Sequence, residues 1–200
     1  MARRSDAKQR MVQAAKELIQ RNGCDATAFS DVLKLSDAPR GSVYFHFPGG
    51  KAQLVTEAAA AHAHEQVELI DRVADDVDSA TGLVERYMDL GREGMVASDY
   101  TRGCAVAPLV TEGTLRESPE VAETSRRAFS EMVDRLAFHF TAFGVERTAA
   151  RVLADAVLAG IEGAMVTSRA LHSPAPYDSV RAVLSCYAVA VSPTAARDSQ

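Results

Sequence analysis

The stretch from Phe29 to Lys51, FSDVLKLSDAPRGSVYFHFPGGK, predicts a helix, a tight turn and a second short helix. Ser36-Asp37-Ala38 supplies the turn. Pro39 suits the first turn of the second helix, because it has no N–H to lose and a φ already set for a helix. Pro48-Gly49-Gly50 ends that helix. We therefore expect the rest of the chain to hold this helix-turn-helix unit in place.

Helical periodicity extends through the remaining sequence. Upstream, apolar residues recur at spacings of three and four from a start near Ser5 or Asp6 to Asn22-Gly23, which ends the first helix. Thr27 and Ser30 are candidate N-caps of the second helix. Further helices are predicted over residues 51–77, 80–98, 103–110, 118–143, 147–171 and 177–191. Because no alternation with a period of two reaches strand length, we predict an all-α fold.

Positive charge is concentrated near the amino terminus. Residues 1–51 hold nine Lys and Arg against five Asp and Glu, whereas residues 52–200 hold thirteen against twenty-two. A basic end beside an acidic remainder is typical of a protein that meets phosphate with one end, although chance local bias would give the same counts. We predict a helix-turn-helix DNA-binding domain over residues 1–50. A helical effector-binding and dimerisation domain is expected over residues 51–200.

The second helix of the unit offers side chains suited to the major groove. Arg40 can form a bidentate pair with guanine O6 and N7, Ser42 can contact a base or a phosphate, and Gly41 removes bulk between them. Tyr44 and Lys51 are expected to contact phosphate oxygens, which sets register rather than sequence preference. Taken singly, each residue fits a solvated charge or a packing contact equally well, and their order and spacing favour DNA. The predicted DNA-binding residues are Thr27, Pro39, Arg40, Gly41, Ser42, Tyr44, His46 and Lys51.

Two segments carry a family pattern, VQAAKELIQRNG and TAFSDVLKLSDAPRGSVYFHFPGGKAQL. Over residues 5–54 they resemble the N-terminal DNA-binding domain of the TetR family of bacterial transcriptional repressors. The turn departs from that family at Asp37, where glycine is usual, and at Ala38, where valine is usual. Aspartate tolerates the left-handed region better than most residues, so we expect the turn to survive at a modest cost.

The resemblance implies a nine-helix subunit, a homodimer joined by a four-helix bundle of the last two long helices, and a ligand cavity in the C-terminal domain. RGCAVAPLVTEG and SPEVAETSRRAF, together with FPGGK, are similar to the LmrA/YxaF-like branch, whose members often repress drug-export or flavonoid-responsive genes. The function implied is a DNA-binding transcriptional regulator, most commonly a repressor. A small hydrophobic or aromatic effector would release it from a palindromic, double-stranded operator.

Candidate residues for the effector lie on the central helices, because such a site needs mostly apolar walls and a few orienting polar groups. Apolar residues at helical spacing are more often plain core than a pocket wall. The candidates are His62, Met88, Met95, Cys104, Phe129, Met132, Phe140 and Glu162.

The last two helices are apolar over more than one face, which favours a dimer interface over burial within one subunit. Burial within the subunit is the alternative. The predicted interface residues are Leu153, Val157, Leu158, Ile161, Met165, Val180, Val183, Leu184 and Tyr187.

Enzyme activity is not expected. The sequence has no GxSxG elbow, HExxH pair or GxxxxGK[ST] loop. His62 and His64 are two residues apart on a predicted helix and face different ways, so no shared metal and no cofactor are predicted. The remaining alternative is a helical ligand-binding or protein-interaction module whose helix-turn-helix no longer binds DNA. The departures from the family pattern at Asp37 and Ala38 keep this alternative open.

Cysteine usage and hydropathy indicate a cytoplasmic, nucleoid-associated protein. The chain's three cysteines lie far apart and form no CxxC pair, so each is predicted to be a small buried hydrophobic residue. The opening MARRSDAKQR is basic and polar, and no later apolar run approaches the length of a membrane span.

Overall fold

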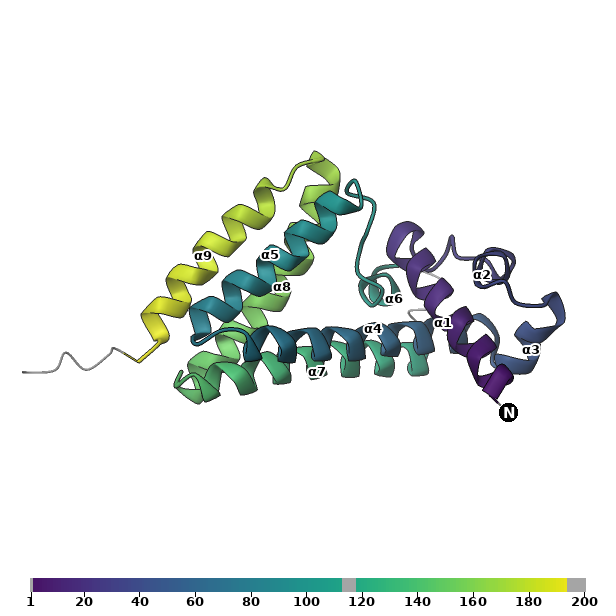
Figure 1. Cartoon of the computed structure of the whole chain (residues 1–200), viewed down its shortest axis with the longest axis horizontal. Coiled ribbons are helices and arrows are strands. Elements are labelled where there is room, and N and C mark those ends of the chain that lie inside the picture. Colours follow the sequence, from purple (N-terminus) through teal and green to yellow (C-terminus); the bar gives the residue numbers. More distant parts are fainter. Residues whose placement is uncertain (1, 113–117, 194–200) are drawn as a thin grey trace, which may run out of the picture. The chain divides into compact units, whose positions relative to one another are not determined.

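The computed structural model describes residues 2–112 and 118–193, except for the side chains of residues 2–5 and of Arg40. Within those ranges the chain forms nine α-helices and one 3₁₀ turn, and no strand (Figure 1). The predicted all-α fold is confirmed. The elements are α1 (Ala2–Asn22), α2 (Phe29–Ser36), η1 (Arg40–Ser42), α3 (Val43–His46), α4 (Gly50–Asp75), α5 (Ala80–Ala97), α6 (Ala107–Thr111), α7 (Pro119–Ala142), α8 (Arg147–Leu171) and α9 (Ala175–Val191).

Side-chain caps set the starts of two long helices. Ser79 caps α5, and its hydroxyl accepts a hydrogen bond from the Gly82 N–H at 3.1 Å. Glu146 caps α8, and its carboxylate accepts from the N–H groups of Thr148 and Ala149. These backbone hydrogen bonds hold the pKa of Glu146 below its ordinary value. The bounds of α8 are those predicted from the sequence.

The starts of α1 and α6 differ from the predicted ones by more than two residues. α1 begins at Ala2 rather than near Ser5 or Asp6, because the preceding Ala-Arg-Arg run also favours a helix. α6 begins at Ala107, whereas residues 103–110 were predicted. The chain before it turns around Cys104, whose Sγ accepts a hydrogen bond from the Val106 N–H at 3.2 Å.

The predicted caps of α2 were wrong. Ala28 occupies the N-cap position in an extended conformation and makes no side-chain cap hydrogen bond. Thr27 instead donates its hydroxyl to the Gly23 carbonyl at 2.7 Å, and Ser30 lies inside the helix. Thr27 therefore stabilises the turn before α2 rather than the helix itself.

The third helix is shorter than the sequence predicted. Pro39 was expected in its first turn, but it precedes the helix in an extended conformation, with φ −61° and ψ 138°. The Pro39 carbonyl accepts hydrogen bonds from the Ser42 N–H at 2.9 Å and from the Ser42 hydroxyl at 2.6 Å. This i to i+3 bonding forms the 3₁₀ turn η1, and α3 covers only one α-helical turn.

The chain falls into two compact units. Unit one comprises Met1–Gln66 and Thr101–Glu131, and unit two comprises Val67–Tyr100 and Met132–Gln200. In unit two, α5, α8 and α9 pack against one another around buried residues such as Leu83, Leu153 and Tyr177. Across the described residues, every helix is too short or too polar to span a bilayer.

Candidate nucleic-acid interface

We call residues 2–50 the head, a helix-turn-helix supported by α1. Its core consists of side chains that are at most 1% exposed. Val43 and Phe47 lie four residues apart and both point into that core, so they define the inward face of α3. The intervening residues consequently face outward. The core residues are Met11, Ile19, Val32, Val43 and Phe47.

Two aromatic side chains form the outward tip of the head. Tyr44 is 75% exposed and Phe45 is 67% exposed. The Tyr44 ring lies 6.2 Å from the Phe29 ring, and the Phe45 ring packs edge-on against His46 at 5.1 Å between centroids. Phe45 was not among the residues predicted to bind DNA. The sequence signal that could have identified Phe45 is the spacing of Val43 and Phe47, because two buried residues four apart leave Phe45 on the outward side of the helix.

The turn between α2 and η1 forms despite its departure from the family pattern. Asp37 takes the left-handed conformation, with φ 51° and ψ 40°. The Ala38 N–H donates to the Leu33 carbonyl at 3.2 Å, and Arg10 Nε of α1 donates to the Ser36 carbonyl at 3.1 Å. A cation at the C-terminus of α2 is favourable for the helix dipole. The expected tolerance of aspartate at this turn is confirmed.

The other predicted contact residues differ in their exposure and in whether their polar groups are already hydrogen-bonded. Thr27 is 2% exposed and its hydroxyl is used within the head. Ser42 donates its hydroxyl to Pro39, so it can donate to a phosphate only by giving up that bond. Pro39 and Gly41 are exposed, and His46 is half-buried. The Arg40 side chain lies outside the described residues.

Lys51 and Glu112 hold the turn that joins α1 to α2. Lys51 Nζ donates to the Asp25 carbonyl at 3.0 Å, and the Asp25 N–H donates to Glu112 Oε2 at 2.7 Å. Gly23 has a φ of +83°, and a Cβ there would collide with the Glu112 carboxylate. The positive φ therefore favours glycine at position 23, and a larger residue there would also displace the Glu112 carboxylate, which follows α6.

Replacement of Glu112 by alanine is expected to lower the free energy of unfolding by about 1 kcal/mol, because the Asp25 N–H loses its acceptor. Urea unfolding measures the change. Glu112→Gln is the matched control, since its amide oxygen can still accept that hydrogen bond. Equal losses in the two variants would contradict the assigned role of the acceptor.

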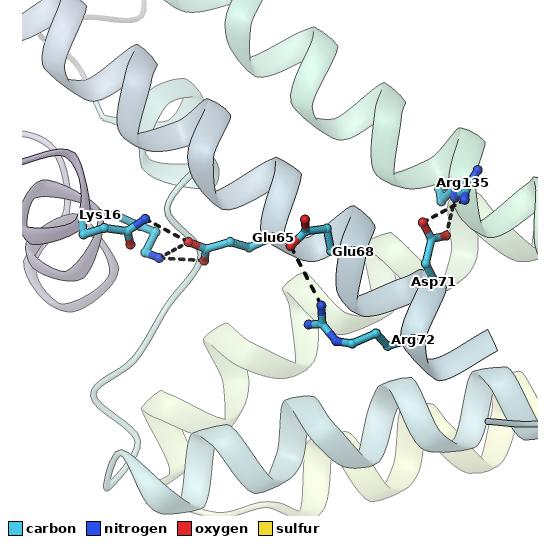
Figure 2. Close-up of polar contacts among 7 residues, drawn as sticks. Lys16, Glu65, Glu68, Asp71, Arg72 and Arg135 are labelled. Atoms are coloured by element: carbon cyan, nitrogen blue, oxygen red, sulfur yellow. Dashed lines mark hydrogen bonds and ion pairs between the residues drawn. The ribbon is translucent and has the colours of Figure 1, made fainter. Parts of the chain in front are cut away.

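Ion pairs neutralise part of the positive charge of the head. Lys16 Nζ lies 2.5 Å from a Glu65 carboxylate oxygen, and the two side chains point toward each other (Figure 2). Lys8 pairs with Glu57 at 2.8 Å. These lysines bind α1 to α4 and are less available to phosphate than the sequence counts imply. Lys51 donates one ammonium hydrogen to the Asp25 carbonyl and keeps two for that purpose.

The predicted effector residues divide between the units. His62, Cys104 and Phe129 belong to unit one, and the others belong to unit two. All are buried except for the half-buried Phe129 and Glu162. Burial lowers the pKa of His62 to about 4, and the charges of Lys16 and Arg102 act in the same direction. Among the described residues, no cluster of His, Cys, Asp and Glu could hold a metal ion.

The predicted interface residues include several that face the interior of their own subunit. Those buried within the chain are Leu153, Val157, Leu158, Ile161 and Leu184, whereas Met165 and Val180 are half-buried. Val183 and Tyr187 are 69% and 36% exposed. The outward faces of the same helices also carry valines that sequence reasoning missed, namely Val152, Val166 and Val189.

A carboxylate on α4 joins that helix to α7 in unit two. Asp71 accepts hydrogen bonds from Arg135 Nε and from Arg135 Nη2, the latter at 2.8 Å (Figure 2). Its carboxylate also lies 2.7 Å from His139 Nε2. The hydrogen bonds from Arg135 are the main reason that the pKa of Asp71 lies below its ordinary value. No local sequence pattern indicates this cluster, because Asp71 and its partners are more than sixty residues apart.

The cysteines do not share one environment. Cys24 and Cys104 are buried as predicted, but Cys186 is exposed. The prediction was wrong for Cys186 because α9 turns that position outward. Burial raises the pKa of the Cys24 thiol to about 12, so that thiol is unreactive.

Comparisons with known proteins agree for both halves of the chain. Residues 11–58 match the family of bacterial regulatory proteins of the tetR type, and residues 80–183 match the C-terminal domain of LmrA/YxaF-like transcriptional regulators. An uncharacterised HTH-type transcriptional regulator of Mycobacterium tuberculosis H37Rv is 33% identical over 177 residues, covering 86% of this chain and 89% of the relative. The HTH-type transcriptional regulator LmrA of Bacillus subtilis is 29% identical over 175 residues, covering 86% and 90%.

Solved structures share the fold. The regulatory protein TetR from Rhodobacter sphaeroides superposes with a TM-score of 0.79 at 21% identity, covering 90% of this chain and 98% of that chain. A TetR transcriptional regulator from Legionella pneumophila gives a TM-score of 0.76 at 18% identity, covering 88% and 94%. The matched families and relatives are regulators and not enzymes. The chain therefore belongs to the TetR family of bacterial transcriptional regulators, and its N-terminal domain is a DNA-binding domain.

Proposed function

We propose that this regulator is a repressor that binds a palindromic operator as a homodimer and leaves it when a small hydrophobic or aromatic effector binds. The observation that carries the proposal is the outward tip of the head, where Tyr44 and Phe45 are exposed beside η1. A short helix with an exposed leading face can enter the major groove, whereas a head without DNA contacts has no need of two exposed aromatic rings.

The outward faces of α8 and α9 support the homodimer. On α8, Val152, Ala159 and Val166 recur every seven residues and are all exposed, so they share one face. On α9, Val183 and Val189 are 69% and 64% exposed. A second copy of the same faces would bury them in a four-helix bundle. Two heads about 34–36 Å apart, or at a multiple of that distance, would then meet successive major grooves.

Effector release follows from linkage. A ligand that binds more tightly to a dimer whose heads are misplaced must weaken operator affinity by the same factor. In unit two the candidates are mostly buried and apolar, with the half-buried Glu162 as an orienting group, which favours a hydrophobic or aromatic ligand. In unit one the polar candidate is His62. Burial keeps His62 uncharged at neutral pH, so its ring can both donate and accept a hydrogen bond. The protein acts in the cytoplasm, where the operator is.

Replacement of Arg40 by alanine is expected to cost about 1–3 kcal/mol of operator affinity and to relax base preference at one position. Lys51→Ala is expected to weaken binding to all sequences alike, because an ammonium group contacts phosphate rather than a base edge. It should also flatten the slope of log affinity against log salt by about one. Fluorescence anisotropy with duplexes selected from random DNA measures both effects.

The same titrations decide between the proposal and a vestigial head. Binding that barely responds to salt, or equal affinity of wild type and Arg40→Ala for the selected duplex, would contradict DNA reading by this head. Lys34→Ala is the matched control for Lys51→Ala, since Lys34 is an exposed lysine on α2 that is not expected at the groove.

A further inference from the structure

Phe45 is an apolar residue of the head whose exposure the described part of its own subunit does not explain. Its side chain is 67% exposed, although Val43 and Phe47 on either side are at most 1% exposed. Burying a phenyl ring is worth about 2–3 kcal/mol, so an outward phenylalanine forgoes a large stabilisation. It lies beside Tyr44 on the surface that the proposed function turns toward DNA.

The orientation of the ring is set by its neighbour. Phe45 packs edge-on against His46, with 5.1 Å between ring centroids and an interplanar angle of 82°. Phe138 on α7 makes a closely similar contact with His139, at 5.2 Å and 79°, and is 58% exposed. The chain therefore contains the same Phe–His arrangement twice, once at the tip of the head and once in unit two.

A phenyl ring restricts what Phe45 can recognise in the groove. It has no hydrogen-bonding atom, whereas the edges of the base pairs in the major groove present donors and acceptors at nearly every position. The C5-methyl group of thymine is the apolar exception. A ring that displaces water from a hydrogen-bonding edge would lose affinity, and a ring against the methyl group gains it.

We infer that Phe45 reads thymine, through contact of its ring with the C5-methyl group of one T in each half of the operator. The inference rests on the proposed function, because it requires the head to enter the major groove. It adds a base to the one assigned to Arg40 and makes Phe45 a determinant of sequence specificity. Tyr44, which carries a hydroxyl, is left to contact phosphate.

Deoxyuridine provides the test, since it differs from thymidine only by the missing methyl group. A duplex selected from random DNA by the wild-type protein is resynthesised with each T in turn replaced by dU, symmetrically in both half-sites. One replacement is expected to weaken wild-type binding roughly fourfold per half-site, or about fifteenfold in total, as loss of one buried methyl group predicts. The other replacements are expected to have little effect.

The variants locate the contact. Phe45→Ala is expected to bind the T and dU duplexes equally, and Phe45→Leu to keep most of the discrimination, because leucine still offers an apolar surface. Phe138→Ala should behave as wild type, since it removes the matching phenylalanine outside the head. Thermal unfolding of the Phe45 variants should be unchanged because the side chain is exposed.

Two results would overturn the inference. Wild-type binding that is indifferent to every dU replacement shows that no methyl group is read. A dU penalty that persists in Phe45→Ala assigns the methyl group to another residue. If that variant also binds both duplexes more weakly by the same factor, the ring contributes to affinity in another way, for example as a wedge between base steps. Failure of the wild type to select any DNA would overturn the proposed function as well.

Discussion

A Val183→Asp variant is expected to be a folded monomer. Val183 is 69% exposed on α9, on the outward face that the proposed homodimer buries. The substitution would bring one unpaired carboxylate from each subunit into an apolar interface, which costs about 3 kcal/mol or more. Association should weaken at least about a hundredfold. Sedimentation velocity at micromolar concentration measures the change, and operator affinity should fall with it because the two heads are no longer coupled.

Two matched variants separate the interface from the core. Val96→Asp places the same charge at an exposed valine on α5 and should leave the dimer intact. Leu158→Asp, at a side chain that is 8% exposed within its own subunit, should instead lower the melting temperature of the subunit itself. An unchanged sedimentation profile for Val183→Asp would exclude α9 from the interface.

Acidification from pH 6.5 to pH 4 is expected to lower the free energy of unfolding by about 3 kcal/mol through His62 alone. Burial lowers the pKa of this imidazole from 6.5 to about 4 in the folded chain, and Lys16 and Arg102 act with it while Glu65 opposes it. Above pH 6.5 the ring is neutral in both states, so the full stability is present. Between these values only the unfolded chain takes up the proton, so stability falls as pH falls, and it levels off below about pH 4.

Urea unfolding at a series of pH values tests this dependence, and the difference between wild type and His62→Gln isolates the contribution of His62. Subtraction is needed because the pKa values of Glu65 and Asp71 are also lowered, and these carboxylates add their own loss at lower pH. His64→Gln is the control, since His64 is exposed on the same helix. A variant His62→Gln with the same acid slope as wild type would contradict the assignment.

The long helices were predictable because their signals are local. Apolar residues recur at helical spacing from Arg147 to Leu171, and α8 has the predicted bounds. Pro39 shows where local signals mislead. Its φ fits a helix, but the Ser42 hydroxyl and N–H both bond to its carbonyl, and the resulting 3₁₀ turn displaces the helix start.

The local conformation of the candidate site was predictable from the sequence. The long-range contacts that stabilise it were not. Asp37 was expected in the left-handed region and adopts it. The hydrogen bond of Glu112 to the Asp25 N–H joins residues 87 positions apart, which no periodicity could indicate. The faces of α8 were also ambiguous, because both are apolar. Leu158 was assigned to the interface from its type, and only the packed structure distinguishes it from the exposed Val166.

Moving this DNA-binding head onto a related regulator is limited by three carboxylates outside the head that bind its residues. Lys8, Lys16 and the Asp25 N–H are held by Glu57, Glu65 and Glu112, and all three carboxylates lie beyond residue 50. A chimera that transplants residues 1–50 onto another regulator would leave those carboxylates behind. Grafts that also carry the first half of α4 and the residue equivalent to Glu112 should retain the melting behaviour of the parent, which makes these acids a practical guide to where the chain can be recombined.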